Sequence, residues 1–133
     1  MRSASAALAA LAACGSGEVA LDLQFSALVN GAPLACGRVY DHVGVSDRSV
    51  ELADARLYVH DPQLITAAGT LTPLALDPDP PFQRDRLALL DFEDGRGQCR
   101  HGDPATRTTI RGTAPADDYV RIRFALGRPH ALA

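Results

Sequence analysis

The chain has 133 residues, a formal net charge of −3 and a hydrophobic content of 47%. This size suits a single domain with one modest core. Acidic and basic residues are mixed along the chain, so the composition indicates no basic face for binding nucleic acid.

The first residues of the chain are interpreted as a targeting segment. Arg2 supplies a minimal charged region, residues 6–13 are a short apolar stretch, and small residues precede Cys14. The sequence LAAC that ends at this cysteine matches a bacterial lipobox, in which the peptide is cut before a cysteine that is then lipidated. We expect a signal peptide over 1–13, a lipid anchor on Cys14 and a tether over 14–18. The alternatives are an ordinary signal peptide with an incidental cysteine, or the start of a fragment.

The cysteine count agrees with this interpretation. Three cysteines are an awkward number for an exported protein. Lipidation of Cys14 would leave Cys36 and Cys99 as one pair, and an oxidising compartment would allow a bridge between them. The bridge would close a long loop and stabilise the fold by about 4 kcal/mol in the chain-entropy model.

Short segments that alternate apolar and polar residues follow one another along the chain, which is typical of half-buried strands. The strand candidates are residues 19–26, 36–40, 50–60, 63–65, 71–76, 87–90, 106–110 and 119–126. Asn30-Gly31 predicts a hairpin turn. Asp61-Pro62 and Gly112 are each expected to end a strand, the former because proline cannot donate in a ladder. We predict an all-β fold, an antiparallel β-sandwich formed as one domain by residues 19–133.

The candidate strand at 119–126 has the clearest alternation and lies near the end of the chain. The sandwich is therefore expected to be incomplete at its C-terminus, with an exposed edge or apolar face that makes the chain poorly soluble or oligomeric. The side chains expected to face the core are Val120, Ile122, Phe124 and Leu126, and those expected to face solvent are Arg121 and Arg123.

No catalytic motif is found, and we expect the protein not to be an enzyme. The sequence has no nucleophile elbow, glycine-rich phosphate loop, Cys-x-x-Cys or His-Glu-x-x-His motif. Asp91 and Glu93 are two residues apart and would share one face of a strand beside a turn, where a structural role is the simpler interpretation.

Histidines are the candidate metal ligands, because a neutral imidazole suits copper and zinc. No two histidines have the spacing typical of ligands on one element, so the fold would have to bring them together. Taken one at a time, each histidine is also explained as a surface or hydrogen-bonded residue. His60 is the first candidate, at the end of a strand. His101 is the second, since a bridge at Cys99 would hold its backbone, and His130 is the third, after the last strand. His42, in a polar loop, is the weakest.

Several segments, in order, resemble the MbnP-like family, copper-binding proteins encoded beside methanobactin operons and in metallo-mystery pair systems. The segments are CGRVY at 36–40, DARLYVHD at 54–61, LALLDFED at 87–94, TTIRG at 108–112 and IRFALGRP at 122–129. The resemblance covers nearly all of the chain after the signal segment. It implies copper as the cofactor, a periplasmic or outer-membrane-associated location, and a di-haem peroxidase-like partner of the MbnH type that oxidises a tryptophan to kynurenine.

The chain departs from the family pattern in three ways. It contains no tryptophan, and Phe82 stands before Gln83 where the family's aromatic residue is often Trp. It has two candidate disulfide cysteines where the family has four. It ends at Ala133, where similar proteins continue with a segment that bears a histidine.

The resemblance implies an exported copper-binding protein that acts in copper homeostasis with a di-haem partner. The candidate copper ligands are then His60, His101 and His130. The alternative is a lipid-anchored β-sandwich that serves as a structural or interaction module without a functional metal site.

Overall fold

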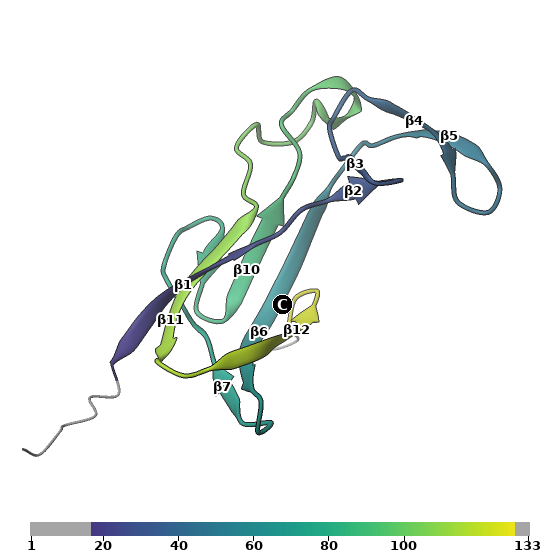
Figure 1. The fold of residues 1–133 in the computed structure, drawn as a ribbon. Helices are drawn as coiled ribbons and strands as arrows, with labels where there is room; N and C mark the ends of the chain where they lie inside the picture. Colours follow the sequence, from purple (N-terminus) through teal and green to yellow (C-terminus); the bar gives the residue numbers. More distant parts are fainter. Residues whose placement is uncertain (1–16, 130–133) are drawn as a thin grey trace, which may run out of the picture.

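The computed structural model describes residues 17–129, which form antiparallel β-strands and one short 3-10 turn, η1 (Gly97–Cys99) (Figure 1). The strands are β1 (Glu18–Gln24), β2 (Leu28–Val29), β3 (Ala32–Pro33), β4 (Val39–Val43), β5 (Arg48–Glu51), β6 (Arg56–Thr66), β7 (Leu71–Pro73), β8 (Ala75–Leu76), β9 (Gln83–Arg84), β10 (Leu87–Asp91), β11 (Thr109–Pro115) and β12 (Tyr119–Leu126). Within 17–129, no helix has the length and apolar character needed to cross a membrane. The predicted all-β fold is confirmed. The predicted signal peptide, Cys14 and His130 lie outside the described residues.

The strands form two main sheets that together curve into a half-barrel. One sheet has the order β1-β11-β8, and the other has the order β12-β6-β10-β9 with β7 also paired to β6. Gln83 of β9 links the two sheets: its side-chain amide donates to the carbonyls of Asp77 and Arg111, and its side-chain oxygen accepts the Arg111 N–H, each at 2.8 Å. Because Gln83 is buried, these three hydrogen bonds hold the line along which the sheets meet.

The hydrophobic core lies between the two sheets. Its buried residues are Val59, Leu64, Leu74, Ala88, Leu90, Ile110 and Ala114. Phe25 and Phe124 pack against this cluster and contact each other edge to face, with ring centroids 5.9 Å apart. Full burial of an aliphatic side chain stabilises a fold by about 1.5–3 kcal/mol, so a core of this size is modest, as the composition predicted.

Two hairpins extend from one end of the half-barrel, at the upper right of Figure 1. The β2–β3 hairpin turns at Asn30-Gly31, whose φ angles are 48° and 77°, as the Asn-Gly pair predicted. In the β4–β5 hairpin, β4 begins at Val39 rather than at Cys36, which lies in the preceding turn.

The predicted disulfide is present. Cys36 is bonded to Cys99, with the Cα atoms 5.9 Å apart, so the segment before β4 is tied to the 3-10 turn that follows β10. Cys99 is 1% exposed, and the bridge closes a loop of 63 residues in sequence. The link therefore fixes the arm of hairpins to the body of the half-barrel.

β6 runs through Asp61-Pro62, so the prediction that this pair ends a strand is wrong. Asp61 adopts a φ of 51° and its N–H donates to the Arg86 carbonyl at 2.9 Å, while the Pro62 carbonyl accepts the Leu74 N–H at 2.9 Å. In the ladder between β6 and β12, Asp61 and Pro62 have no paired residue, and neither does Phe124 on the opposite strand. The strand bends at a bulge that needs no N–H from proline. The candidate at 50–60 is divided between β5 and β6.

β11 does not end at Gly112, as the sequence predicted, but continues to Pro115. Gly112 lies between Leu21 of β1 and Leu76 of β8, and a Cβ at this position would stand 2.4 Å from the Ala75 carbonyl oxygen. The glycine therefore permits a close approach of two strands instead of terminating one.

β12 has the predicted bounds, but of its four predicted core residues only Phe124 is partly buried and packs against the core. Val120, Ile122 and Leu126 are 57%, 38% and 64% exposed. Ile122 is opposite the buried Leu64, so it faces the predicted side of the sheet. Burial also needs a second layer, and β12 is the last strand of its sheet, where the described part of the chain only partly covers it.

Candidate functional site

The face of the β6–β10 pair that points away from the core carries the first candidate ligand. Along β6, Val59 is buried in the core, so the adjacent Tyr58 and His60 project to the opposite side. They lie across from Leu89 and Leu87 of β10. His60 is thus placed on a strand with a neighbour on each side, since β12 also pairs with it through Ala125.

His60 is oriented by a carboxylate. Its Nδ1 atom lies 2.6 Å from Oδ2 of Asp61, and its side chain is 17% exposed against 41% for Asp61. With the Nδ1 proton donated to Asp61, the lone pair is on Nε2, the ring atom that is left for a metal or another acceptor role. A carboxylate that fixes the tautomer of a histidine in this way is the usual outer partner of a metal-binding imidazole.

Asp61 is itself held in place from two directions. Its left-handed φ of 51° turns the residue out of the ladder, and its N–H donates to the Arg86 carbonyl. The Arg86 guanidinium contacts the second carboxylate oxygen, with Nη1 3.3 Å from Oδ1. Aspartate tolerates this backbone conformation better than most residues, so the bulge and the oriented carboxylate have one cause.

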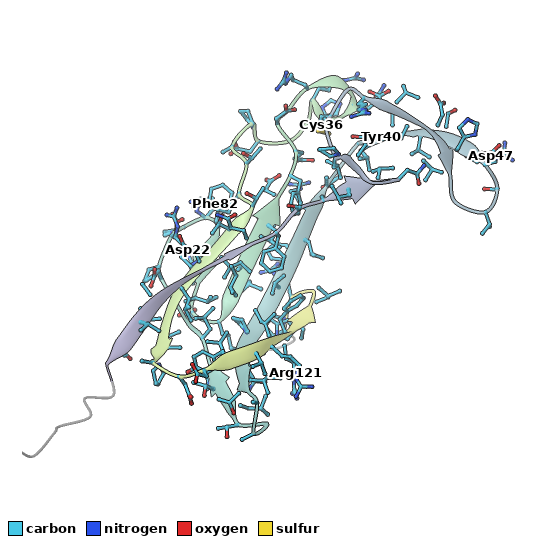
Figure 2. The ribbon with its side chains drawn as sticks, viewed as in Figure 1. Asp22, Cys36, Tyr40, Asp47, Phe82 and Arg121 are labelled. Carbon is cyan, nitrogen blue, oxygen red and sulfur yellow. A yellow bond between two sulfur atoms is a disulfide. The ribbon has the colours of Figure 1, made fainter. Side chains whose placement is uncertain are left out.

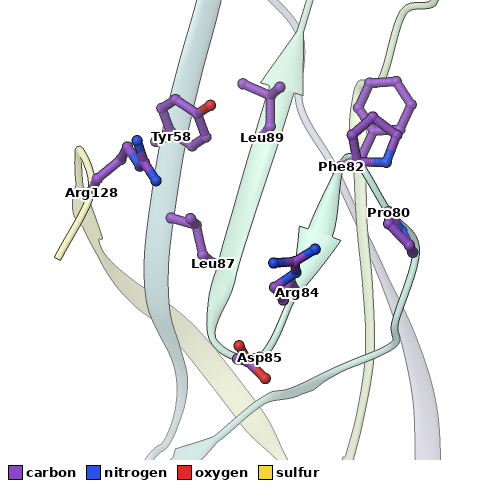
Figure 3. A pocket seen from close by; sticks show the side chains of 9 residues that line it. Tyr58, Pro80, Phe82, Arg84, Asp85, Leu87, Leu89 and Arg128 are labelled. Atoms are coloured by element: carbon purple, nitrogen blue, oxygen red, sulfur yellow. The ribbon is translucent and has the colours of Figure 1, made fainter. Parts of the chain in front are cut away.

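A pocket of about 260 Å³ lies on this face and includes Leu87, the cross-strand partner of His60, but His60 itself does not line it (Figure 3). Its lining residues are Tyr58, Pro80, Pro81, Phe82, Arg84, Asp85, Leu87, Leu89 and Arg128. Arg128 lies over the Tyr58 ring at 5.6 Å from the centroid, and Arg107 lies over the Phe82 ring at 4.8 Å. The site is therefore an apolar floor with cationic and aromatic walls, and Phe82 stands at the position where the sequence led us to expect an aromatic residue.

The structure does not bring His60 and His101 together. His101 lies in the loop after Cys99, and the next residue, Gly102, abuts the Glu93 side chain near the Arg56 end of β6. His60 is four residues further along that strand, about 13 Å at the usual rise per residue. Among residues 17–129 there is no group of three or more His, Cys, Asp or Glu side chains that could hold a metal ion.

His42, the weakest candidate, makes a contact of the same kind as His60 in a different environment. Its Nδ1 lies 2.7 Å from Oδ1 of Asp47 in the β4–β5 hairpin, but the two side chains are 82% and 71% exposed. Solvent competes for both groups, so the pairing does not orient an imidazole as firmly as it does at His60.

Asp91 and Glu93 are buried, at 3% and 1% exposure, as a structural role requires. The Asp91 carboxylate accepts the Glu93 N–H at 3.1 Å, and burial raises the pKa of Asp91 above its ordinary value. The Glu93 carboxylate faces the guanidinium of Arg56, whose Nε is 3.4 Å away. On the outer side of the same arginine, Asp54 accepts a hydrogen bond from it, which lowers the pKa of Asp54.

The sequence pointed to His60 but not to the role of its neighbour. Asp61 was interpreted as part of a strand break, and the pocket beside Tyr58 and Phe82 had no sequence signal. The adjacency of a histidine and an aspartate at the end of an alternating segment was the signal that could have indicated the oriented pair.

Comparison with known proteins gives two matches to one family. The model of the MbnP family matches residues 18–133. Among solved structures, the chain is similar to MbnP from Methylosinus trichosporium, with 35% sequence identity and a TM-score of 0.72. That alignment covers 85% of this chain and 40% of the other, so this chain spans less than half the length of the solved protein. A search of curated proteins finds no match.

Proposed function

The chain belongs to the MbnP family, which is methanobactin-associated, and we propose that it is an exported copper-binding protein in which His60 is a copper ligand. The observation that carries the proposal is the contact between His60 and Asp61, which leaves Nε2 as a ligand atom on a rigid strand. The protein acts in copper homeostasis.

The donor set fits copper in part. An imidazole nitrogen is a good ligand for Cu(I) and Cu(II), and the contact with Asp61 keeps the Nδ1 proton in place. His101 lies at the other end of the β6–β10 pair and does not share an ion with His60. His130, which lies outside residues 17–129, is the proposed second ligand in this chain.

The proposal extends to location and partner. Export to the periplasm, with a lipid anchor on Cys14, accounts for a disulfide between Cys36 and Cys99 in a bacterial setting. A di-haem protein of the MbnH type is the proposed partner.

Copper titration of the exported protein tests the ligand assignment. His60→Ala is expected to abolish binding of one copper ion, and Asp61→Asn to weaken it by about 10- to 100-fold, because the ring loses its carboxylate partner. His42→Ala removes a histidine with the same type of aspartate contact and is the matched control, expected to bind as the parent does.

Two outcomes would contradict the assignment. Equal copper affinity in the parent and in His60→Ala would exclude His60 as a ligand. A parent protein that binds no copper would favour the alternative of a lipid-anchored interaction module without a metal site.

A further inference from the structure

The turn of the β2–β3 hairpin holds the only asparagine in the chain. Asn30 is followed directly by Gly31, and both residues have a positive φ angle. A Cβ built on Gly31 would meet no atom of residues 17–129 within 4 Å, so no packed group in that part of the chain shields this side of the turn. The side-chain amide of Asn30 and the backbone nitrogen of the next residue therefore lie in an open, exposed turn.

The side chain of Asn30 also joins the two hairpins of the arm, β2–β3 and β4–β5. Its Nδ2 atom donates to two carbonyl oxygens of β4, that of Asp41 at 3.1 Å and that of His42 at 3.0 Å. A primary amide has two N–H groups, so a single asparagine supplies both hydrogen bonds. We call this contact the Asn30 joint.

Tyr40 of β4 makes a second contact between the same hairpins (Figure 2). Its hydroxyl donates to the Pro33 carbonyl at 2.8 Å and accepts the Ala35 N–H at 2.7 Å. Tyr40 is 5% exposed, whereas Asn30 lies at the surface of the described chain. The arm is thus fastened by one buried side chain and one exposed side chain, and the exposed one precedes a glycine.

An asparagine that precedes a glycine can lose its side-chain amide without an enzyme. The Gly31 nitrogen attacks Cγ of Asn30, the new C–N bond closes a succinimide ring, and the side-chain nitrogen leaves as ammonia with the proton of the Gly31 N–H. Water then opens the ring at either carbonyl and gives aspartate or isoaspartate. Asparagine is a thermolabile residue, and glycine favours this reaction because it has no Cβ to obstruct the attack.

Asp94-Gly95 provides a comparison within the same chain. Gly95 also has a positive φ angle, but a Cβ built on it would stand 3.6 Å from Pro104, so this turn is packed. The Asp94 carboxylate accepts hydrogen bonds from the backbone N–H of Arg96 at 3.1 Å and from its Nε at 2.7 Å, and these bonds hold the pKa of Asp94 below its ordinary value. An ionised carboxylate would have to expel an oxide ion to close the ring, so the equivalent reaction is disfavoured at Asp94.

We propose that Asn30 is a site of spontaneous deamidation, and that the reaction opens the Asn30 joint. The carboxylate that forms has no N–H group, so it cannot donate to the carbonyls of Asp41 and His42. It also brings a negative charge toward two carbonyl oxygens, which repel it. The contact through Tyr40 is retained, so the modified arm keeps one of its two fastenings while its hairpins separate at the turn.

The Asn30 joint also controls the rate of the reaction. While Nδ2 is held by the two carbonyls, the amide is not free to turn toward the Gly31 nitrogen. Deamidation therefore proceeds from local openings of the arm, whose free energy is set by the contacts that close it. Weakening the neighbouring Tyr40 contact should increase these openings and accelerate the loss of ammonia.

The test incubates the full chain at neutral and mildly alkaline pH and follows the peptide that contains Asn30 by mass spectrometry. We expect its mass to rise by the difference between an amide and an acid, and the rate to increase with pH because the attacking nitrogen must lose its proton. The Asp94-Gly95 peptide of the same digest is the internal control, expected to form isoaspartate more slowly. Asn30→Gln is the matched variant: it keeps an amide but would have to close a larger ring, so its peptide should remain unchanged over the same period.

Two further variants examine the link between the reaction and the arm. Tyr40→Phe removes the hydroxyl of the second contact and should deamidate at Asn30 faster than the parent. Asn30→Asp reproduces the product and should show faster backbone hydrogen exchange in β4 and β5 than the parent, with exchange in β6 and β10 unchanged. Far-UV circular dichroism and the melting temperature of each variant establish that it is folded.

Several outcomes would overturn the proposal. If the Asn30 peptide stayed intact in the full chain while a synthetic peptide of residues 27–34 lost its amide, the fold would protect this site. Isoaspartate at Asp94 as fast as the loss at Asn30 would show that the local contacts do not select the site. Unchanged hydrogen exchange in Asn30→Asp, or an unchanged rate in Tyr40→Phe, would show that the reaction and the joint are not connected.

Discussion

The two final strands of the described chain, β11 and β12, have similar alternating sequence patterns but differ in how deeply their apolar side chains are buried. In β11 every second residue is buried, with Ile110 and Ala114 each 1% exposed. In β12 the alternation is clearer in sequence, but Ile122 is 38% exposed and Leu126 is 64% exposed. The difference lies in the neighbours: β11 has β1 on one side and β8 on the other, and β12 has only β6.

This comparison shows that alternation specifies which face of a strand is apolar but not whether that face is covered. A side chain is removed from water only when a second layer lies over it, and that layer comes from elsewhere in the fold. Among residues 17–129, the apolar face of β12 is therefore only partly covered, and that of β11 is part of the core.

The largest effect is expected from the disulfide, which fastens the loop that leads into β11. Cys36→Ala/Cys99→Ala should lower the free energy of unfolding by about 4 kcal/mol, because the unfolded chain is no longer constrained by a loop of 63 residues. Urea unfolding followed by circular dichroism measures this loss. The bridge would be shown not to contribute to stability if the urea midpoint of the parent stayed the same after reduction and the double variant had that same midpoint.

Matched isoleucines test the comparison directly. Ile110→Ala on β11 should destabilise the protein by about 3 kcal/mol, since it leaves a cavity in the core. Ile122→Ala on β12 should cost less than about 1 kcal/mol in the monomer, because the side chain is partly in water already. Urea unfolding of both variants at low protein concentration checks the pair. Equal losses would show that the two strands are equally well covered.

A glycine substitution examines the close approach of β11 to its neighbour. Gly112→Ala should destabilise the protein by about 2 kcal/mol, because the added Cβ would stand 2.4 Å from the Ala75 carbonyl oxygen and force the strands apart. Gly17→Ala is the control, since a Cβ there meets no atom within 4 Å. Thermal unfolding compares them. A neutral Gly112→Ala would mean that β8 can move away from β11 at no cost.

The smallest effect concerns Asp91, whose backbone pairs with Arg107 ahead of β11. Burial raises the pKa of Asp91, so the native state holds its proton more tightly than the unfolded state, and this carboxyl favours folding as the pH falls. Asp91→Asn lacks this titration. The variant should therefore be relatively more stable than the parent at pH 7, and the difference should shrink as the pH is lowered through the raised pKa toward 3.8, the ordinary value.

Urea unfolding of the Asp91→Asn variant and the parent between pH 7 and pH 4 measures this difference. The Asp91 carboxylate also accepts a hydrogen bond from the Glu93 N–H. An asparagine oxygen can accept the same hydrogen bond, so the substitution need not remove this contact. Parallel stability curves over this range would show that Asp91 does not titrate differently in the two states.

Parts of the fold could be predicted with no knowledge of the structure because they depend on local chemistry. The Asn30-Gly31 turn follows from the left-handed conformation that these two residues tolerate, and the bounds of β12 follow from its alternation. The errors at Asp61-Pro62 and Gly112 have a common source. Local preference predicts that Pro62 and Gly112 each end a strand. In the structure, a bulge accommodates Pro62 within β6, and a close approach to β8 requires Gly112 within β11.

The candidate site divides in the same way. The choice of His60 rested on strand geometry, and the structure adds its contact with Asp61 and the pocket beside Phe82. The separation of His60 from His101 could not be predicted, because it depends on which ends of β6 and β10 lie near the loop after Cys99.

The sequence alone determined the strand content of this protein, the bridge between Cys36 and Cys99 and the resemblance to its family, because these depend on residue type, spacing and order. Only the tertiary structure decided which apolar faces are covered and which strand edges have no partner strand among residues 17–129. These depend on residues that are distant in sequence, such as Leu21 and Ile122, which line the same pocket, and no local pattern records such proximity.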